Sequence, residues 1–261
     1  MYRHLLVPVK TPAEVEPMIR FAAKLLDADG EIRMLHIIPT TTMPQVTREW
    51  RASVNLVVPA HEVAAVLDVR VEPEVRASVD VPGEILESAE AHGIDGIVVG
   101  LGGDRRSRNP FVGHTVSGLL HHARTDVLIL NRLALANPKV GRILVPSLRG
   151  PTSPRTMQLA DQLALRMGGI PVVPLGPVSS AENGRRPPDP PEPRRPFAAG
   201  ALLPRRRHLA QLLLRSAAQA RYGFLVVGEE TSDRSGPPVL TRPFLEELFR
   251  EAPCPVLALR R

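Results

Sequence analysis

The chain has 261 residues, of which 43% are hydrophobic and 23% charged, and its formal net charge is +6. This balance is typical of a globular protein and excludes a highly charged disordered chain. No apolar run approaches the roughly 18 residues that span a bilayer, and the apolar part of the N-terminal segment is too short for a signal peptide. The single cysteine, Cys254, excludes an internal disulfide framework and a cysteine metal site. We therefore expect a cytoplasmic protein without membrane insertion.

The charge is distributed unevenly along the chain. Residues 1–132 carry 14 Lys and Arg against 17 Asp and Glu, whereas residues 133–261 carry 19 against 10. Seven arginines lie between Arg185 and Arg207, in a proline-rich stretch. This stretch is either a solvated segment or a contact for an acidic partner, nucleic acid or membrane surface.

The first half alternates short aliphatic runs with amphipathic segments, and this alternation predicts a parallel sheet with helices on both faces. A glycine that follows an amphipathic segment marks a helix end. Residues 40–66 are ambiguous, although 59–68 have a helical pattern. The expected strands are 4–9, 31–38, 69–78, 95–100 and 126–131, and the expected helices are 12–30, 82–93 and 113–124.

The second half repeats the same plan. Its expected strands are 142–148, 170–175, 224–230 and 255–261, and its expected helices are 152–169, 208–223 and 242–252. A segment rich in Pro, Gly, Ser and Arg, residues 176–207, replaces the third strand and is predicted to be a loosely packed loop. Residues 133–141 link the halves. We therefore predict two domains, 1–132 and 141–261.

The loop at 100–112 leaves the carboxyl end of a predicted strand and enters a helix. Ligands bind at this edge of open parallel sheets, and unpaired N–H groups at a helix start favour anions. Glycines let the backbone approach a phosphate closely. The loop therefore either holds a phosphate or is only a long turn.

The spacing Gly100-x2-Gly103-x9-Gly113 resembles the nucleotide loop of universal stress protein domains. The resemblance covers nearly all of residues 1–132 and, in weaker form, 141–261, so the chain resembles a tandem universal stress protein. It implies an α/β fold with two open five-stranded parallel sheets, each of strand order 3-2-1-4-5. Some members of this family bind ATP or AMP. The implied nucleotide-binding residues are Pro8, Val9, Lys10, Ile37, Gly100, Gly103, Arg105, Arg106, Gly113, His114 and Thr115.

Two positions depart from the family pattern. The family usually has an Asp after the first strand, where this chain has Lys10, and a Ser or Thr after the third glycine, where it has His114. Lys10 cannot accept a hydrogen bond from an adenine amino group, but it could attract a phosphate. His114 can donate a ring N–H, and Thr115 can supply a hydroxyl. Arginines in the loop are either phosphate ligands or solvated side chains.

The second half does not keep the glycine motif. Aligned on the strand ends, Gly228, Thr231 and Thr241 occupy the three glycine positions. Glu229 and Glu230 stand where a phosphate would approach, so we expect the second domain to be degenerate and to bind no nucleotide.

Other reactive side chains do not form a site. His121 and His122 diverge by about 100° on a helix and are not a metal pair. His36 is either a core histidine or a neighbour of the ligand pocket. Cys254 is predicted to be an inert buried thiol, because no cationic partner is near it in the sequence. We predict no metal and no catalytic residue.

The sequence therefore favours a non-catalytic stress-response or regulatory module that binds an adenine nucleotide in its first domain. The alternative is an interaction module in which neither domain binds nucleotide. In the family that the chain resembles, paired domains often associate through their last strands. We therefore expect the aliphatic edge strands 126–131 and 255–261 to pair antiparallel, which gives an intramolecular pseudo-dimer. Further homo-oligomers and the identity of a protein partner stay open.

Overall fold

The computed structural model describes residues 1–40, 42–101, 113–131, 140–147, 152–175, 210–211, 213–215, 223–228 and 240–260. The first half comprises β1 (Tyr2–Val9), α1 (Pro12–Ala23), β2 (Leu26–Ile38), α2 (Met43–Ala52), α3 (Val54–Leu67), β3 (Arg70–Ala77), α4 (Val81–Ala91), β4 (Gly96–Gly100), α5 (His114–His122) and β5 (Asp126–Leu130). The second half comprises β6 (Arg142–Pro146), α7 (Pro154–Arg166), β7 (Val172–Leu175), β8 (Gly223–Gly228), α9 (Arg242–Glu251) and β9 (Val256–Arg260).

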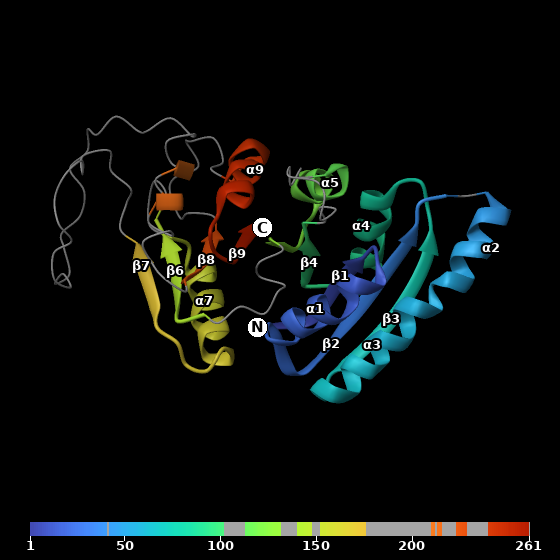
Figure 1. The fold of residues 1–261 in the computed structure, drawn as a ribbon, viewed down its shortest axis with the longest axis horizontal. Coiled ribbons are helices and arrows are strands. Elements are labelled where there is room, and N and C mark those ends of the chain that lie inside the picture. Colours follow the sequence, from blue (N-terminus) through green and yellow to red (C-terminus); the bar gives the residue numbers. More distant parts are fainter. Residues whose placement is uncertain are drawn as a thin grey trace.

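The strands form one open α/β sheet of nine strands in the order β3-β2-β1-β4-β5-β9-β8-β6-β7. The expectation of two separate five-stranded sheets is therefore wrong. The first five strands do keep the order 3-2-1-4-5, and all of their pairs are parallel. The second half contributes four strands, because the segment expected to replace its third strand, 176–207, falls outside the described residues. Figure 1 shows the two halves side by side, with the C-terminus near their junction.

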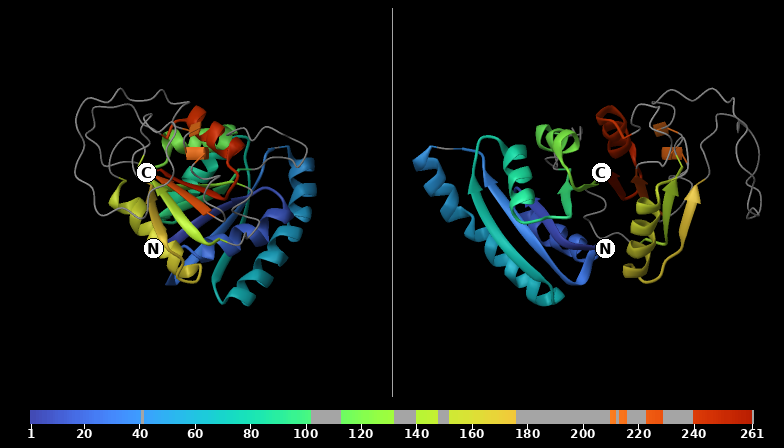
Figure 2. Two further views of the ribbon diagram at one scale, coloured as in Figure 1. Left: turned by 60° about the vertical axis from the view of Figure 1, so that its left-hand side comes forward. Right: turned by 180° about the vertical axis from the view of Figure 1, so that it is seen from behind.

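The two halves join through an antiparallel pair of strands, as predicted. Val127 of β5 pairs with Arg260 of β9, and Leu130 pairs with Leu257. Past the strand end, the Asn131 side chain accepts a hydrogen bond from Val256 N at 3.0 Å and donates one to the Cys254 carbonyl at 3.1 Å. Each half thus covers the edge that the other would expose, and Figure 2 shows this junction from two further sides.

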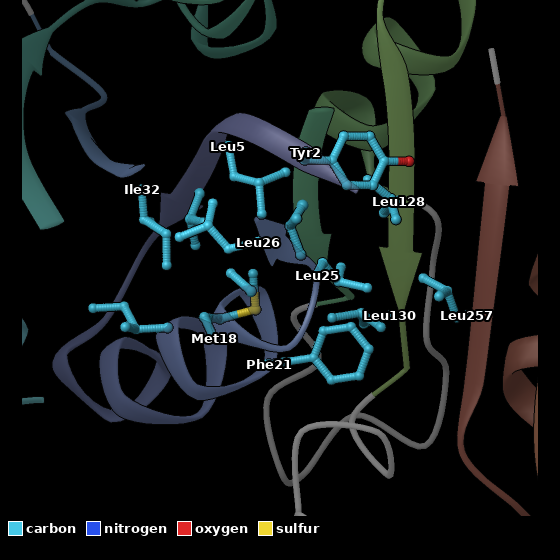
Figure 3. Close-up of a cluster of buried hydrophobic side chains, with 14 of the residues drawn as sticks. Tyr2, Leu5, Met18, Phe21, Leu25, Leu26, Ile32, Leu128, Leu130 and Leu257 are labelled. Carbon is cyan, nitrogen blue, oxygen red and sulfur yellow. The ribbon is translucent and has the colours of Figure 1, made fainter. Parts of the chain in front are cut away.

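Successive side chains of a strand point to opposite faces of a sheet, and two apolar cores follow from this alternation. One core lies under α1, α3 and α7, and includes Leu5 and Met18 (Figure 3). The other lies under α4, α5 and α9, and includes Leu6. The first core crosses the junction, since Phe21 of α1 stacks on Phe224 of β8 with ring centroids 6.1 Å apart.

Several predicted boundaries shift for local reasons. The first helix ends at Ala23 rather than Gly30, and Gly30 lies inside β2. The ambiguous stretch 40–66 forms α2 and most of α3. Helix α4 begins where Asp80 accepts a hydrogen bond from Gly83 N, and Gly93 follows its end with a φ of +59°. No helix among the described residues is long and apolar enough to cross a membrane.

Candidate functional site

The sheet opens at the carboxyl ends of β1 and β4. The paired register of these strands ends at Leu6 and Ile97, three residues before Val9 and Gly100. The chain order reverses at this point, because β2 lies on one side of β1 and β4 on the other. Such a switch point forms the crevice in which open α/β sheets bind ligands. Pro8, Val9 and Gly100, three of the predicted site residues, lie at these two strand ends.

A capping box closes the turn from β1 into α1. The Glu14 carboxylate accepts hydrogen bonds from Lys10 N at 2.8 Å and from Thr11 N at 3.3 Å. These are backbone N–H groups at a helix start, which would otherwise be open to an anion. Glu14 is half-buried, and it places an acceptor beside Lys10, whose side chain has none. Sequence reasoning missed this role, although the pattern Thr11-x-x-Glu14 signals it.

The predicted β2 residue lies at the next strand end. Ile37 is half-buried and pairs with Arg76 of β3. Its neighbour His36 has its ring Nδ1 3.0 Å from the carbonyl oxygen of Val9. Because a carbonyl only accepts, Nδ1 carries the proton. His36 thereby ties β2 to the end of β1. Both alternatives for this histidine, a core residue or a neighbour of the ligand pocket, remain predictions.

The start of α5 supplies the last described part of the predicted loop. Gly113 is the N-cap, with φ −61° and ψ 168°, and both it and His114 are exposed. Thr115 is half-buried. An added Cβ at Gly113 meets nothing within 4 Å. This backbone conformation is one that any residue adopts, so neither φ nor space in the described structure requires glycine here. Gly103, Arg105 and Arg106 lie outside the described residues.

The second half has the same arrangement of strand ends as the first, but a side chain occupies the space at the end of β8. The register of β6 with β8 ends at Leu144 and Leu225, three residues before Gly228. A Cβ on Gly228 would overlap the Thr156 side chain, which is fully buried. Thr156 and Glu14 both occupy the third position of their helices, after Pro154 and Pro12. Thr156 therefore occupies the space at the strand end, whereas the Glu14 carboxylate bonds to the backbone of Lys10 and Thr11.

The rest of the predicted motif in the second half is only partly described. Thr241 is the N-cap of α9, which corresponds to Gly113 as predicted from the alignment. Its Oγ1 is buried and has no hydrogen-bond partner among the described residues. Glu229, Glu230 and Thr231 fall in the stretch that is not described.

The remaining candidate side chains are bonded within their own helix or buried. His121 bonds through Nδ1 to the Ser117 carbonyl of its own helix at 2.7 Å. Cys254 is buried, and burial raises the pKa of its thiol to about 11. Within the described part of the chain, no group of three or more His, Cys, Asp or Glu side chains could hold a metal ion.

Comparison with known proteins decides the family. The model of the universal stress protein family matches residues 1–131, half of the chain. The chain belongs to the universal stress protein family. No curated protein sequence matches it significantly.

Solved structures extend the likeness in fold to the whole chain. A universal stress protein from Archaeoglobus fulgidus has 14% identity and a TM-score of 0.64, and the alignment covers 99% of this chain and 98% of that one. A protein from Pseudomonas aeruginosa has 14% identity and a TM-score of 0.61, with 99% and 93% covered. The cytoplasmic domain of a prokaryotic cation chloride cotransporter has 13% identity and a TM-score of 0.50, with 99% and 95% covered. At these identities the likeness shows the fold alone.

Proposed function

We propose that the first half binds one adenine nucleotide in the crevice between β1 and β4, and that the second half binds none. The observation that carries this proposal is the contrast between the two helix starts. Thr156 is fully buried against Gly228 at its strand end, whereas the corresponding Glu14 is only half-buried and bonds to Lys10 N and Thr11 N. The family match over residues 1–131 supports the same half.

The polar groups of the crevice suit the two ends of a nucleotide. The exposed N-terminus of α5, with Gly113 and His114, presents backbone N–H groups and a partial positive charge to a phosphate. The turn after β1 offers the Glu14 carboxylate as an acceptor for an adenine amino group. This acceptor takes the role that Lys10 cannot fill. We therefore place the phosphates near α5 and the adenine near Glu14.

We further propose that the protein is a binding module rather than an enzyme, and that residues 141–261 form a degenerate second domain. The order β9-β8-β6-β7 mirrors β5-β4-β1-β2, which supports a repeat of one plan. The competing function is a nucleotide-independent interaction module. Lys10 favours it, because a lysine replaces the acceptor that the family usually places there.

Ligand content and stoichiometry test these functions. The purified chain is denatured, and the supernatant is analysed by mass spectrometry for ATP and AMP. Calorimetry with each nucleotide then counts the sites. One site per chain, without release of ADP from ATP over hours, is the expected result. Two equal sites contradict the assignment to the first half, and no binding favours the interaction module.

A further inference from the structure

A cavity lies at the edge of the sheet opposite the carboxyl ends of β1 and β4. It has a volume of about 630 Å³, within the range of small-molecule sites. Residues at the end of α1, at the start of β2, at the turn from α3 into β3, and Arg166 of α7 line it. Arg166 donates a hydrogen bond to the Leu26 carbonyl at 3.3 Å, so the second half contributes to a cavity built mainly by the first.

A bulge in β2 shapes this cavity. Tyr2 pairs with Leu26 but His4 pairs with Glu31, so three extra residues of β2 leave the ladder between these pairs. The bulged stretch includes Asp29 and Gly30, and both line the cavity. A Cβ on Gly30 would lie 2.6 Å from the Leu26 side chain and 3.0 Å from the Arg3 carbonyl oxygen. The bulge therefore depends on glycine, and such bulges re-aim side chains near functional sites.

Four cations line the cavity, namely Arg20, Lys24, Arg70 and Arg166. Lys24 and Arg20 stand four residues apart on one helix face, where like charges repel. Burial lowers the pKa of Lys24, and repulsion from Arg20 lowers it further. Arg20 is paired with Glu16 at 2.8 Å, and an anion between Arg20 and Lys24 would reduce their repulsion further.

Carboxylates form the other part of the lining. Asp27 is paired with the N-terminal ammonium of Met1 at 2.9 Å. Asp29 and Asp68 are exposed and come from the bulge and from the end of α3. Carboxylates accept hydrogen bonds from hydroxyl groups. The cavity thus combines donors for an anion with acceptors for hydroxyls.

We infer that this cavity binds a small sugar phosphate, with the phosphate held by Lys24 and Arg166 and the sugar hydroxyls by Asp29 and Asp68. The site is separate from the proposed nucleotide crevice. Because Lys24 follows α1 and Arg166 belongs to α7, a ligand bound by both would bridge the two halves and stabilise their junction.

Calorimetry of the full chain with ribose 5-phosphate, ribose and inorganic phosphate tests this inference. We expect one saturable site for ribose 5-phosphate and at least tenfold weaker binding of the other two. Lys24→Met and Arg166→Gln should each weaken ribose 5-phosphate binding about tenfold, as expected for loss of a charge-assisted hydrogen bond. Arg124→Gln, which removes a cation that is 91% exposed and does not line the cavity, is the matched control and should change nothing.

Three outcomes would overturn the inference. The first is no binding of ribose 5-phosphate, and the second is binding that neither Lys24→Met nor Arg166→Gln weakens. The third is binding that Gly113→Val abolishes, which would place the ligand in the nucleotide crevice. Unfolding midpoints of all variants show whether they fold. If Lys24→Met does not fold, Arg166→Gln still tests the inference, because Arg166 is exposed.

Discussion

Arg155 of α7 holds the buried carboxylate of Asp126 at the start of β5, with Nη2 2.9 Å and Nε 3.0 Å from the same Oδ2. The Tyr2 hydroxyl donates to that oxygen at 2.8 Å, and the Arg155 guanidinium lies 5.0 Å from the centre of the Tyr2 ring. Burial and the Asp126 charge raise the pKa of Tyr2, so its hydroxyl stays a donor. This cluster joins an edge strand of one half to the helix of the other.

Arg155→Gln should destabilise the chain by about 3 kcal/mol, because Asp126 is only 6% exposed and would lose its cation. Asp126→Asn should cost less, about 1–3 kcal/mol, since Arg155 is 42% exposed and can be solvated. Urea unfolding measures both. The exposed pair of Arg124 and Glu90 is the control, and Arg124→Gln should cost below about 1 kcal/mol. Equal costs for Arg155→Gln and Arg124→Gln would contradict the role of this cluster.

Gly113→Val should abolish binding of ATP or AMP while changing the free energy of unfolding by less than about 1 kcal/mol. The described structure leaves open space for a Cβ there, so the loss would come from the close approach of a phosphate to the backbone. Gly118→Ala, on the same helix, is the contrasting variant. Its Cβ would lie 2.7 Å from Pro82 of α4, so it should lower stability and spare nucleotide affinity. Unchanged affinity in a folded Gly113→Val variant rules out this loop as the site.

Gly228→Ala should destabilise the second half by about 1–3 kcal/mol, because the new methyl overlaps Thr156. Thr156→Ala in the same chain should recover part of this loss, since it removes the Oγ1 and Cγ2 atoms that collide. A double-mutant cycle from urea unfolding measures the coupling. Additive effects would mean that Thr156 does not fill the space beside Gly228.

The sequence was sufficient for features that repeat or follow local rules. The alternation of aliphatic runs and helices predicted the strands of the first half, and the aliphatic edges 126–131 and 255–261 predicted their antiparallel pairing. Features that depend on contacts between residues far apart in the sequence could not be predicted. Tyr2, Asp126 and Arg155 meet although Tyr2 and Asp126 lie 124 positions apart, and nothing local marks them.

Two predictions from the sequence, the helix end at Gly30 and the two separate sheets, are wrong for specific physical reasons. Gly30 follows an amphipathic segment, so it resembled a helix stop, but its lack of a side chain serves the close approach of β2 to Arg3. The antiparallel β5–β9 ladder also makes one sheet of what the repeat suggested were two. The site residues Gly103, Arg105 and Arg106 stay predictions, because they fall outside the described residues.

A fragment that ends at Arg132 should form a dimer. It lacks β9, so the apolar edge of β5, Val127 to Leu130, would be open to pairing with a second copy. Sedimentation velocity measures its mass, and the full chain, whose β5 is already paired, is the control. A monomeric fragment would contradict the expectation.

Cys254 should resist thiol reagents in the folded chain and react at once when the chain is unfolded. Its thiol is 6% exposed, and burial raises its pKa to about 11 from the usual 9.0, so little of the reactive thiolate exists near neutral pH. Because the folded-state pKa is raised, the protonated thiol favours the folded state fully below pH 9. This contribution is lost as the pH rises from 9 to 11, where the unfolded chain ionises first. Labelling with an aromatic disulfide at pH 8, with and without urea, measures the reactivity. The free energy of unfolding of the native chain should fall more steeply above pH 9 than that of Cys254→Ala, and parallel curves would show that the thiol titrates normally.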